Sequence, residues 1–127
     1  MTADHNKCAC TGTFCSCNAE CPTASGGEAK CGCGVFVCNC SCSQNQEIVL
    51  PTMNDVQNKN SHLTENYFRK VAKEDLADNL KNLRNAIIER DTKRYVLLGE
   101  KAEANFAELN KFQKKRYFSW ALVNLKK

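Results

Sequence analysis

The sequence predicts two structural parts: a small, irregular, metal-dependent cysteine-rich segment and an all-α tail that forms a helical hairpin or a coiled coil. All ten cysteines of the 127-residue chain lie between residues 8 and 42. The balance of charge also changes, with two lysines and four acids up to residue 50 but 16 Lys and Arg against 10 Asp and Glu after it. Helical periodicity occurs only in the second part. We therefore expect a cysteine-rich segment at 1–45, a linker at 46–62 and a helical tail at 63–127.

The cysteine-rich segment contains an internal duplication. "CACTGTFCSC" at 8–17 and "CGCGVFVCNC" at 31–40 superimpose at a shift of 23 residues, with four cysteines in register. A fifth cysteine follows each copy, at Cys21 and Cys42. The "PTASGGEAK" stretch between the copies has the Pro, Ser and Gly content of a flexible hinge.

The C-x-C spacing favours metal chelation over disulfides. A disulfide across one residue closes a strained ring, because a bridge needs its two Cα atoms about 4.4–6.8 Å apart at a fixed dihedral angle. Soft thiolates select Cu(I) and Zn(II). Ten sulfurs serve two isolated tetrahedral zinc ions, and bridging sulfurs raise this to about three zinc ions or more Cu(I). Because large apolar residues are few here, we expect this segment to be disordered without metal.

The first residues carry no recognisable export signal. "MTADHNKCAC" has no apolar run of the length that a signal peptide needs. No stretch approaches the roughly 18 apolar residues of a membrane-spanning helix. We therefore expect a cytoplasmic location, with the nucleus as the alternative, where glutathione keeps thiols reduced. A secreted domain held by disulfides is a further interpretation, and it predicts no free thiols.

Residues 8–42, with "CACTGTFCSC", "CGCG" and "CNCSC", resemble a metallothionein, specifically the small cysteine-rich metal-binding proteins of fungi. The resemblance implies that the protein buffers or detoxifies copper, zinc or cadmium through thiolate clusters, with several Cu(I) or Zn(II) ions per chain. It also implies that all ten cysteines are metal ligands: Cys8, Cys10, Cys15, Cys17, Cys21, Cys31, Cys33, Cys38, Cys40 and Cys42.

A second family shares only part of this spacing. The CXC domain of tesmin-like DNA-binding proteins also opens with C-x-C-x4-C. Here, however, Ser16 alone separates Cys15 from Cys17, and the segment is slightly acidic. Glu100, Glu103 and Glu108 also interrupt any continuous basic stripe in the tail. Because affinity for phosphate needs positive charge, we do not expect nucleic-acid binding.

The tail shows helical spacing from about Thr64 onward. A change of helix is expected at Asp91–Thr92, where a new N-cap is available, and another at Gly99. An amphipathic helix must bury its apolar stripe, so we expect an antiparallel hairpin, or a coiled coil that recruits a second copy or a protein partner. Apolar residues recur at steps of three or four along two series: Phe68, Val71 or Ala72, Leu76, Leu80, Leu83 and Ile87, then Tyr95, Leu98, Ala102, Phe106, Leu109 and Phe112.

The last residues, "KKRYFSWALVNLKK", combine aromatic and basic side chains. One interpretation is an anchor for a membrane surface or an acidic partner. The other is a helix end whose aromatic residues cover the core while its lysines are solvated. The second is favoured, because apolar residues occupy most of the helix circumference and not one clean face.

No catalytic constellation is present in the sequence, so an enzyme is not expected. The chain has only two histidines, no Ser-His-Asp set and no Gly-rich phosphate loop. The leading hypothesis is a metal-binding protein whose tail localises or oligomerises the metal store. The alternative is a protein-interaction module in which the cysteines form only a structural zinc knot and the helices are the functional surface.

Overall fold

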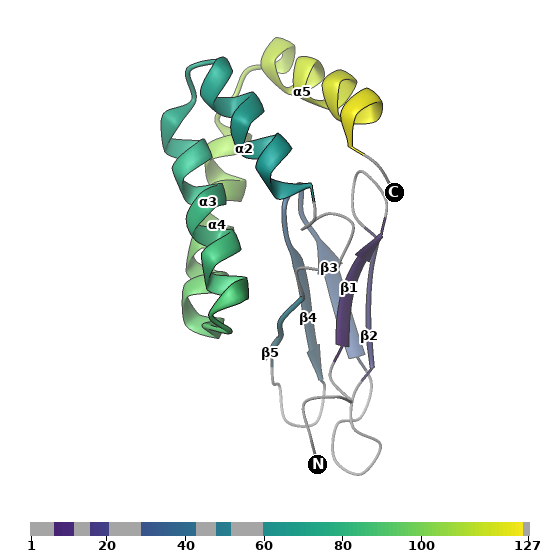
Figure 1. Ribbon diagram of the computed structural model, residues 1–127. Helices are drawn as coiled ribbons and strands as arrows, with labels where there is room; N and C mark the ends of the chain where they lie inside the picture. Colours follow the sequence, from purple (N-terminus) through teal and green to yellow (C-terminus); the bar gives the residue numbers. More distant parts are fainter. Residues whose placement is uncertain (1–6, 12–15, 21–28, 43–47, 52–59, 126–127) are drawn as a thin grey trace.

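The structure, a computed structural model, describes residues 7–11, 16–20, 29–42, 48–51 and 60–125. For 7–11, 16–20, 29, 30, 33, 39 and 42 it describes the backbone alone. A two-stranded hairpin, a three-stranded sheet and a group of helices follow one another across the molecule (Figure 1). The elements are β1 (Lys7–Thr11), β2 (Ser16–Glu20), β3 (Ala29–Cys33), β4 (Cys38–Cys42), β5 (Ile48–Val49), α2 (Ser61–Lys70), α3 (Glu74–Ile88), α4 (Thr92–Ala107) and α5 (Lys111–Asn124).

Each copy of the duplicated cysteine segment forms an antiparallel β-hairpin. β1 pairs with β2, and β3 pairs with β4, whose other edge pairs with β5. The sequence predicts an irregular segment, but the described residues form strands. The reason lies in the C-x-C spacing itself: a residue type that recurs every second position matches the two-residue repeat of a strand.

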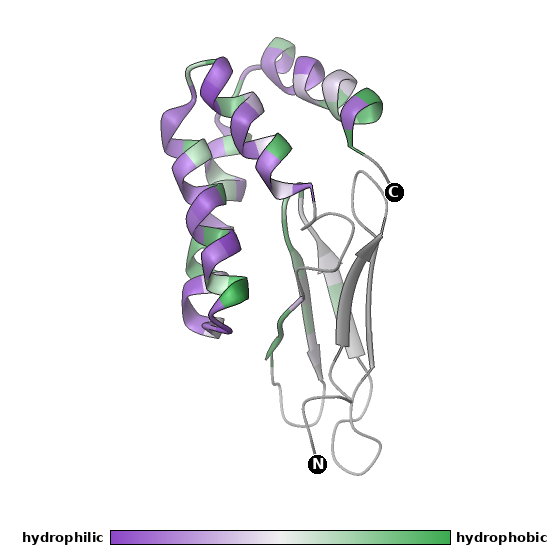
Figure 2. Cartoon of the chain, viewed as in Figure 1, coloured by the Kyte–Doolittle hydropathy of each residue, from purple (hydrophilic) through white to green (hydrophobic). Residues whose placement is uncertain are grey.

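Part of the range expected to be a linker is packed into the fold. Val49 lies opposite Cys40 in the sheet and is 2% exposed. The two residues that follow it, Leu50 and Pro51, are also buried. Arg90, two residues beyond α3, donates a hydrogen bond of 2.7 Å to the carbonyl oxygen of Pro51. In Figure 2 the chain leading into β4 and the β5 strand are coloured as hydrophobic, which matches their position beside the helices.

The expectation of an all-α tail is confirmed, although its arrangement differs from a simple hairpin or coiled coil. Four helices follow one another between Ser61 and Asn124, and α3 packs against both α2 and α4. The expected change of helix at Asp91–Thr92 is confirmed, since the Asp91 side chain caps α4 by accepting from the Arg94 N–H. The break expected at Gly99 is wrong, because α4 continues through it to Ala107.

Aromatic side chains fill the space between α2, α4 and α5. The Tyr117 ring of α5 stacks on Phe68 of α2 with centroids 5.0 Å apart, and it meets Phe106 of α4 edge-on. Trp120 lies against Tyr67, with centroids 4.7 Å apart. These contacts agree with the interpretation that the aromatic residues near the C-terminus cover the core. In the described part of the chain, no helix is both long and apolar enough to cross a membrane.

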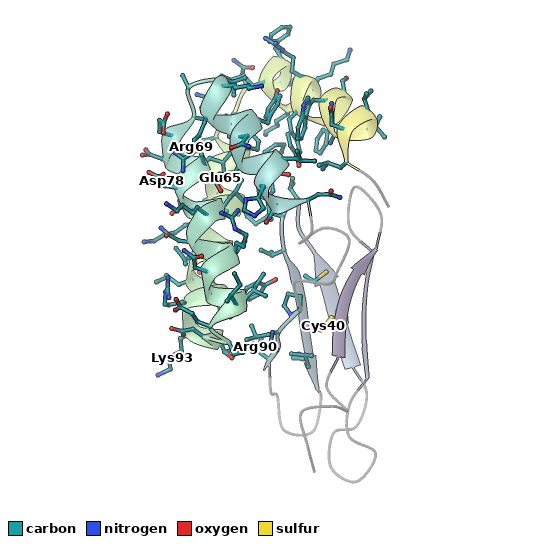
Figure 3. All side chains as sticks on the ribbon, viewed as in Figure 1. Cys40, Glu65, Arg69, Asp78, Arg90 and Lys93 are labelled. Carbon is teal, nitrogen blue, oxygen red and sulfur yellow. A yellow bond between two sulfur atoms is a disulfide. The ribbon has the colours of Figure 1, made fainter. Side chains whose placement is uncertain are left out.

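A buried ion pair connects α2 to α3. The Glu65 carboxylate contacts Arg84 at 2.8 Å and Arg69 at 2.9 Å, and Arg69 also reaches Asp78 (Figure 3). Burial by itself raises the pKa of Glu65, but hydrogen bonds from the two arginines outweigh it and leave this pKa below its usual value. Glu65 is therefore ionised at neutral pH, and its contact with Arg84 joins α2 to α3.

Candidate metal centre

The five cysteines of the second copy lie on one face of the β3–β4 hairpin. The register sets Cys31 opposite Cys40 and Cys33 opposite Cys38. Residues two apart on a strand, and residues directly opposite each other on neighbouring strands, share a face. Cys42, two residues beyond Cys40 and opposite Ala29, belongs to the same face. The sequence therefore folds into two adjacent cross-strand cysteine pairs and a fifth cysteine beside them.

This cysteine face points away from the helices and toward the β1–β2 hairpin. Ile48 belongs to the opposite face of the sheet, where it lines a hollow together with Val96 and Gly99 of α4. The β1–β2 hairpin lies against β3 and β4. Cys38 and Cys40 are fully buried, whereas Cys31 is exposed. In Figure 3, Cys40 lies on the side of β4 away from the helical group. The sulfur-bearing face is therefore enclosed on one side and reachable at Cys31.

The structure brings two of the predicted metal ligands into direct contact. Cys31 and Cys40 form a disulfide with their Cα atoms 4.1 Å apart, and Cys38 is also disulfide-bonded. Among the side chains that the structure describes, no group of three or more His, Cys, Asp or Glu residues is placed to hold a metal ion. Two neighbouring cysteine sulfurs form a disulfide when they are oxidised, and as thiolates they can both bind the same soft metal ion when they are reduced. The donor set of the second copy thus fits thiolate chemistry.

The two copies of the duplication do not have the same register. In the first hairpin Cys10 lies opposite Cys17 and Cys8 opposite Ala19, so these three cysteines share a face. The register of the second copy, carried over by the shift of 23, would instead set Cys8 opposite Cys17. The predicted ligands Cys15 and Cys21 lie outside the described residues. The duplicated sequence therefore provides one pair of cross-strand cysteines in the first described ladder and two in the second.

The turn between β3 and β4 connects the cysteine face to the helices. The Glu103 carboxylate of α4 accepts hydrogen bonds from the backbone N–H of Val35, at 2.9 Å, and of Phe36, at 2.7 Å. The Phe36 ring enters the helical core and contacts Phe68, Phe106 and Tyr117 edge-on. An ionised acceptor makes stronger hydrogen bonds than a neutral one. Glu103 and Phe36 together fix the turn that joins Cys33 of β3 to Cys38 of β4.

Two glycines allow this close approach. A Cβ atom on Gly34 would lie 2.5 Å from the carboxyl carbon of Glu103. A Cβ atom on Gly99 would lie 3.1 Å from Cγ1 of Val37. Gly99 is therefore a contact point for the turn inside a continuous helix, and this contact favours a residue without a Cβ atom at that position.

Tyr95 anchors the first residue of β4. Its hydroxyl donates to the carbonyl oxygen of Cys38 at 3.0 Å and accepts from the Cys38 N–H at 3.3 Å. Tyr95 is itself 2% exposed, so both bonds are made away from water. Sequence reasoning missed Tyr95 and Glu103 as partners of the cysteine segment. No local pattern identifies them, because they act on residues 57 to 68 positions earlier in the chain.

We expect Tyr95→Phe to lower the free energy of unfolding by about 1–3 kcal/mol, since it removes both buried hydrogen bonds to Cys38 while the ring stays in place. Urea unfolding followed by circular dichroism measures the loss, and amide exchange should accelerate at Cys38. Tyr67→Phe is the matched control, because Tyr67 is only partly buried. Equal effects from the two substitutions would contradict the anchoring role of Tyr95.

Comparison with known proteins finds no match to this chain among protein-family models, curated proteins or solved structures.

Proposed function

We propose that the protein binds several soft metal ions through its cysteine thiolates and buffers or detoxifies copper, zinc or cadmium in a reducing compartment. The observation that carries this proposal is the shared face of Cys31, Cys33, Cys38, Cys40 and Cys42 on one hairpin. A single structural ion needs at most four thiolates, so five on one face, with three more cysteines on the neighbouring hairpin, exceed that need. The resemblance of residues 8–42 to metallothioneins agrees with this excess.

Pairs of cysteines on neighbouring strands would hold the ions. Cys31 with Cys40, and Cys33 with Cys38, each supply two sulfurs across the ladder. Bound Cu(I) or Zn(II) would supply strong bonds to thiolate, and because the two pairs are adjacent in the register, a bridging sulfur would be shared between ions. Burial of Cys38 and Cys40 would protect the bound ions from competing water, and exposed Cys31 would give a path for exchange.

The metal content of the full-length protein tests this function. The chain is reduced, loaded anaerobically with Cu(I) or Zn(II), and its mass is measured under native conditions. We expect three or more ions per chain, and about half as many after replacement of the five cysteines of the second copy by serine. The control is Ser41→Ala, on the opposite face of β4. Binding of fewer than three ions would contradict a metal store.

The alternative function, a protein-interaction module with a structural zinc knot, is favoured by a different observation. The β3–β4 turn is part of the helical core through Phe36, so the cysteine segment shapes the helices as well as carrying thiols. This function predicts one or two tightly held zinc ions and unchanged cellular metal tolerance after deletion. A disulfide-held domain, favoured by the Cys31–Cys40 bond, predicts instead that the native protein has no free thiols and takes up no metal.

A further inference from the structure

A pocket of about 580 Å³ lies between the end of α2 and the beginning of α5. Figure 1 shows the end of α2 and the beginning of α5 at the same end of the helical group. Tyr67 and Leu109 form part of its apolar wall, and Phe112 contributes a ring that is 67% exposed. Its size is within the usual range of about 300–1,000 Å³ for small-molecule sites. An apolar ligand that covers this exposed phenyl ring removes apolar surface from water, which favours binding.

The charged residues of this pocket all have the same sign. Lys70, Lys73 and Arg116 line it, and its lining contains no Asp or Glu. None of the three forms an ion pair with a carboxylate among the described residues. Arg69, which is adjacent to Lys70, makes the contrast clear, because it is held by Glu65, Glu74 and Asp78. The lining of the pocket is therefore basic, and the acids nearest in sequence, Glu74, Asp75 and Glu108, line a neighbouring hollow instead.

The shape of the pocket is fixed by the backbone on both sides. Ala72, which follows the C-cap residue of α2, is in the left-handed region with φ of 62°, and it allows the chain to turn directly into α3. On the other side, Asn110 and Gln113 form a capping box that starts α5. The Arg116 guanidinium lies 5.8 Å from the centre of the Phe112 ring, so cation and ring are held together. The apolar wall and the cations are thus arranged before any ligand arrives.

We propose that this pocket binds a small organic anion in which a carboxylate or phosphate group is attached to a flat apolar ring. The ring would lie against Phe112 and Tyr67, and the anionic group would face Lys70, Lys73 and Arg116. Both contributions are needed, because exposed ion pairs alone give little affinity and a half-open apolar pocket alone gives little selectivity. This site is separate from the cysteine face and does not depend on the metal-binding proposal.

The test is a titration of the full-length protein followed by amide proton–nitrogen correlation spectra. Naphthalene-2-carboxylate is the probe, with naphthalene-2-carboxamide as the uncharged analogue and inorganic phosphate as the anion without a ring. We expect saturable shifts confined to residues 67–73 and 109–116 for the carboxylate, and weaker or no response to the other two. The fluorescence of Trp120, the single tryptophan, provides a second readout because its ring lies against Tyr67.

Charge-removing variants test the cations directly. Lys70→Gln and Arg116→Gln are each expected to weaken binding about twofold to fivefold, and Phe112→Ala should weaken the carboxylate and the carboxamide alike. Lys93→Gln is the matched control, because Lys93 is an exposed lysine at the far end of α4 (Figure 3).

Three outcomes would overturn this proposal. The first is the absence of localised shifts with the carboxylate at millimolar concentration. The second is equal affinity for the carboxylate and the carboxamide. The third is shifts that a short acidic peptide produces along the whole of α5, including Leu122 and Val123, while the small anion produces none. That last result would assign the surface to a protein partner instead.

Discussion

Phe36→Ala is expected to lower the free energy of unfolding of the helical tail by about 3–5 kcal/mol, although Phe36 belongs to the cysteine-rich segment. The ring is 7% exposed and contacts aromatic residues of three helices: Phe68 of α2, Phe106 of α4 and Tyr117 of α5. Its removal would leave a cavity at the point where these helices meet, and aromatic neighbours cannot easily collapse into it. Urea unfolding of the reduced protein, followed by the far-ultraviolet helix signal, measures the loss.

Phe112→Ala is the matched control for this experiment. It makes the same chemical change on an α5 side chain that is 67% exposed, and surface changes of this kind are usually within about 0.5 kcal/mol. If Phe36→Ala were as mild as the control, the turn would not be part of the helical core. The cysteine segment and the tail would then be independent in stability.

The buried helix faces and one helix cap could be predicted from the sequence, because they depend on residues that are close together along the chain. The apolar series from Phe68 to Ile87 predicts one buried helix face, and Leu76, Leu80 and Leu83 are buried, but the series crosses from α2 to α3 and Val71 is exposed at the break. The Asp91 cap could be predicted in the same way. The number of helices could not be predicted, because the chain reverses at Ala72, an alanine in the left-handed region, where glycine or asparagine is the usual signal. The Gly99 prediction failed for the opposite reason, since that glycine serves a distant contact with Val37.

The candidate site shows the same division between local and distant information. The spacing of the cysteines predicts which sulfurs are close neighbours along the chain, and strand alternation follows from it. Which cysteines lie opposite each other depends on register, and the sequence repeat alone does not set this. β1 ends at Thr11 and β2 begins at Ser16, whereas the last residue of β3 and the first of β4, Cys33 and Cys38, correspond through the shift of 23 to positions 10 and 15. In the second copy, Glu103 and the burial of Phe36 hold the turn where it is. Those partners are remote in sequence, so no pattern within residues 8–42 predicts the difference.

Metal binding at the cysteine face is expected to stabilise the helices as well as the strands. The Tyr95 hydroxyl is hydrogen-bonded to Cys38, and the Glu103 carboxylate is hydrogen-bonded to the adjoining turn. A metal ion that holds the hairpin in place therefore also preserves these contacts with α4. A ligand that binds only the folded state at about 1,000 times its dissociation constant adds about 4 kcal/mol to the free energy of unfolding. We expect a gain of this size in the helix signal when the reduced chain is loaded with Cu(I) or Zn(II), and its loss on chelation.

Glu103→Ala separates this coupling from simple metal affinity. The substitution leaves every cysteine in place but removes the acceptor for the Val35 and Phe36 N–H groups. Metal should then still bind with nearly unchanged stoichiometry, while the metal-dependent gain in helix stability falls well below that of the unsubstituted chain. Glu100→Ala is the control, because Glu100 is an exposed acid of the same helix. If metal does not change the free energy of unfolding of the helices in the unsubstituted protein, the turn does not couple metal binding to helix stability. Coupling that survives Glu103→Ala undiminished would move its origin to the remaining contacts between the turn and the helices, made by Phe36, Val37 and Tyr95.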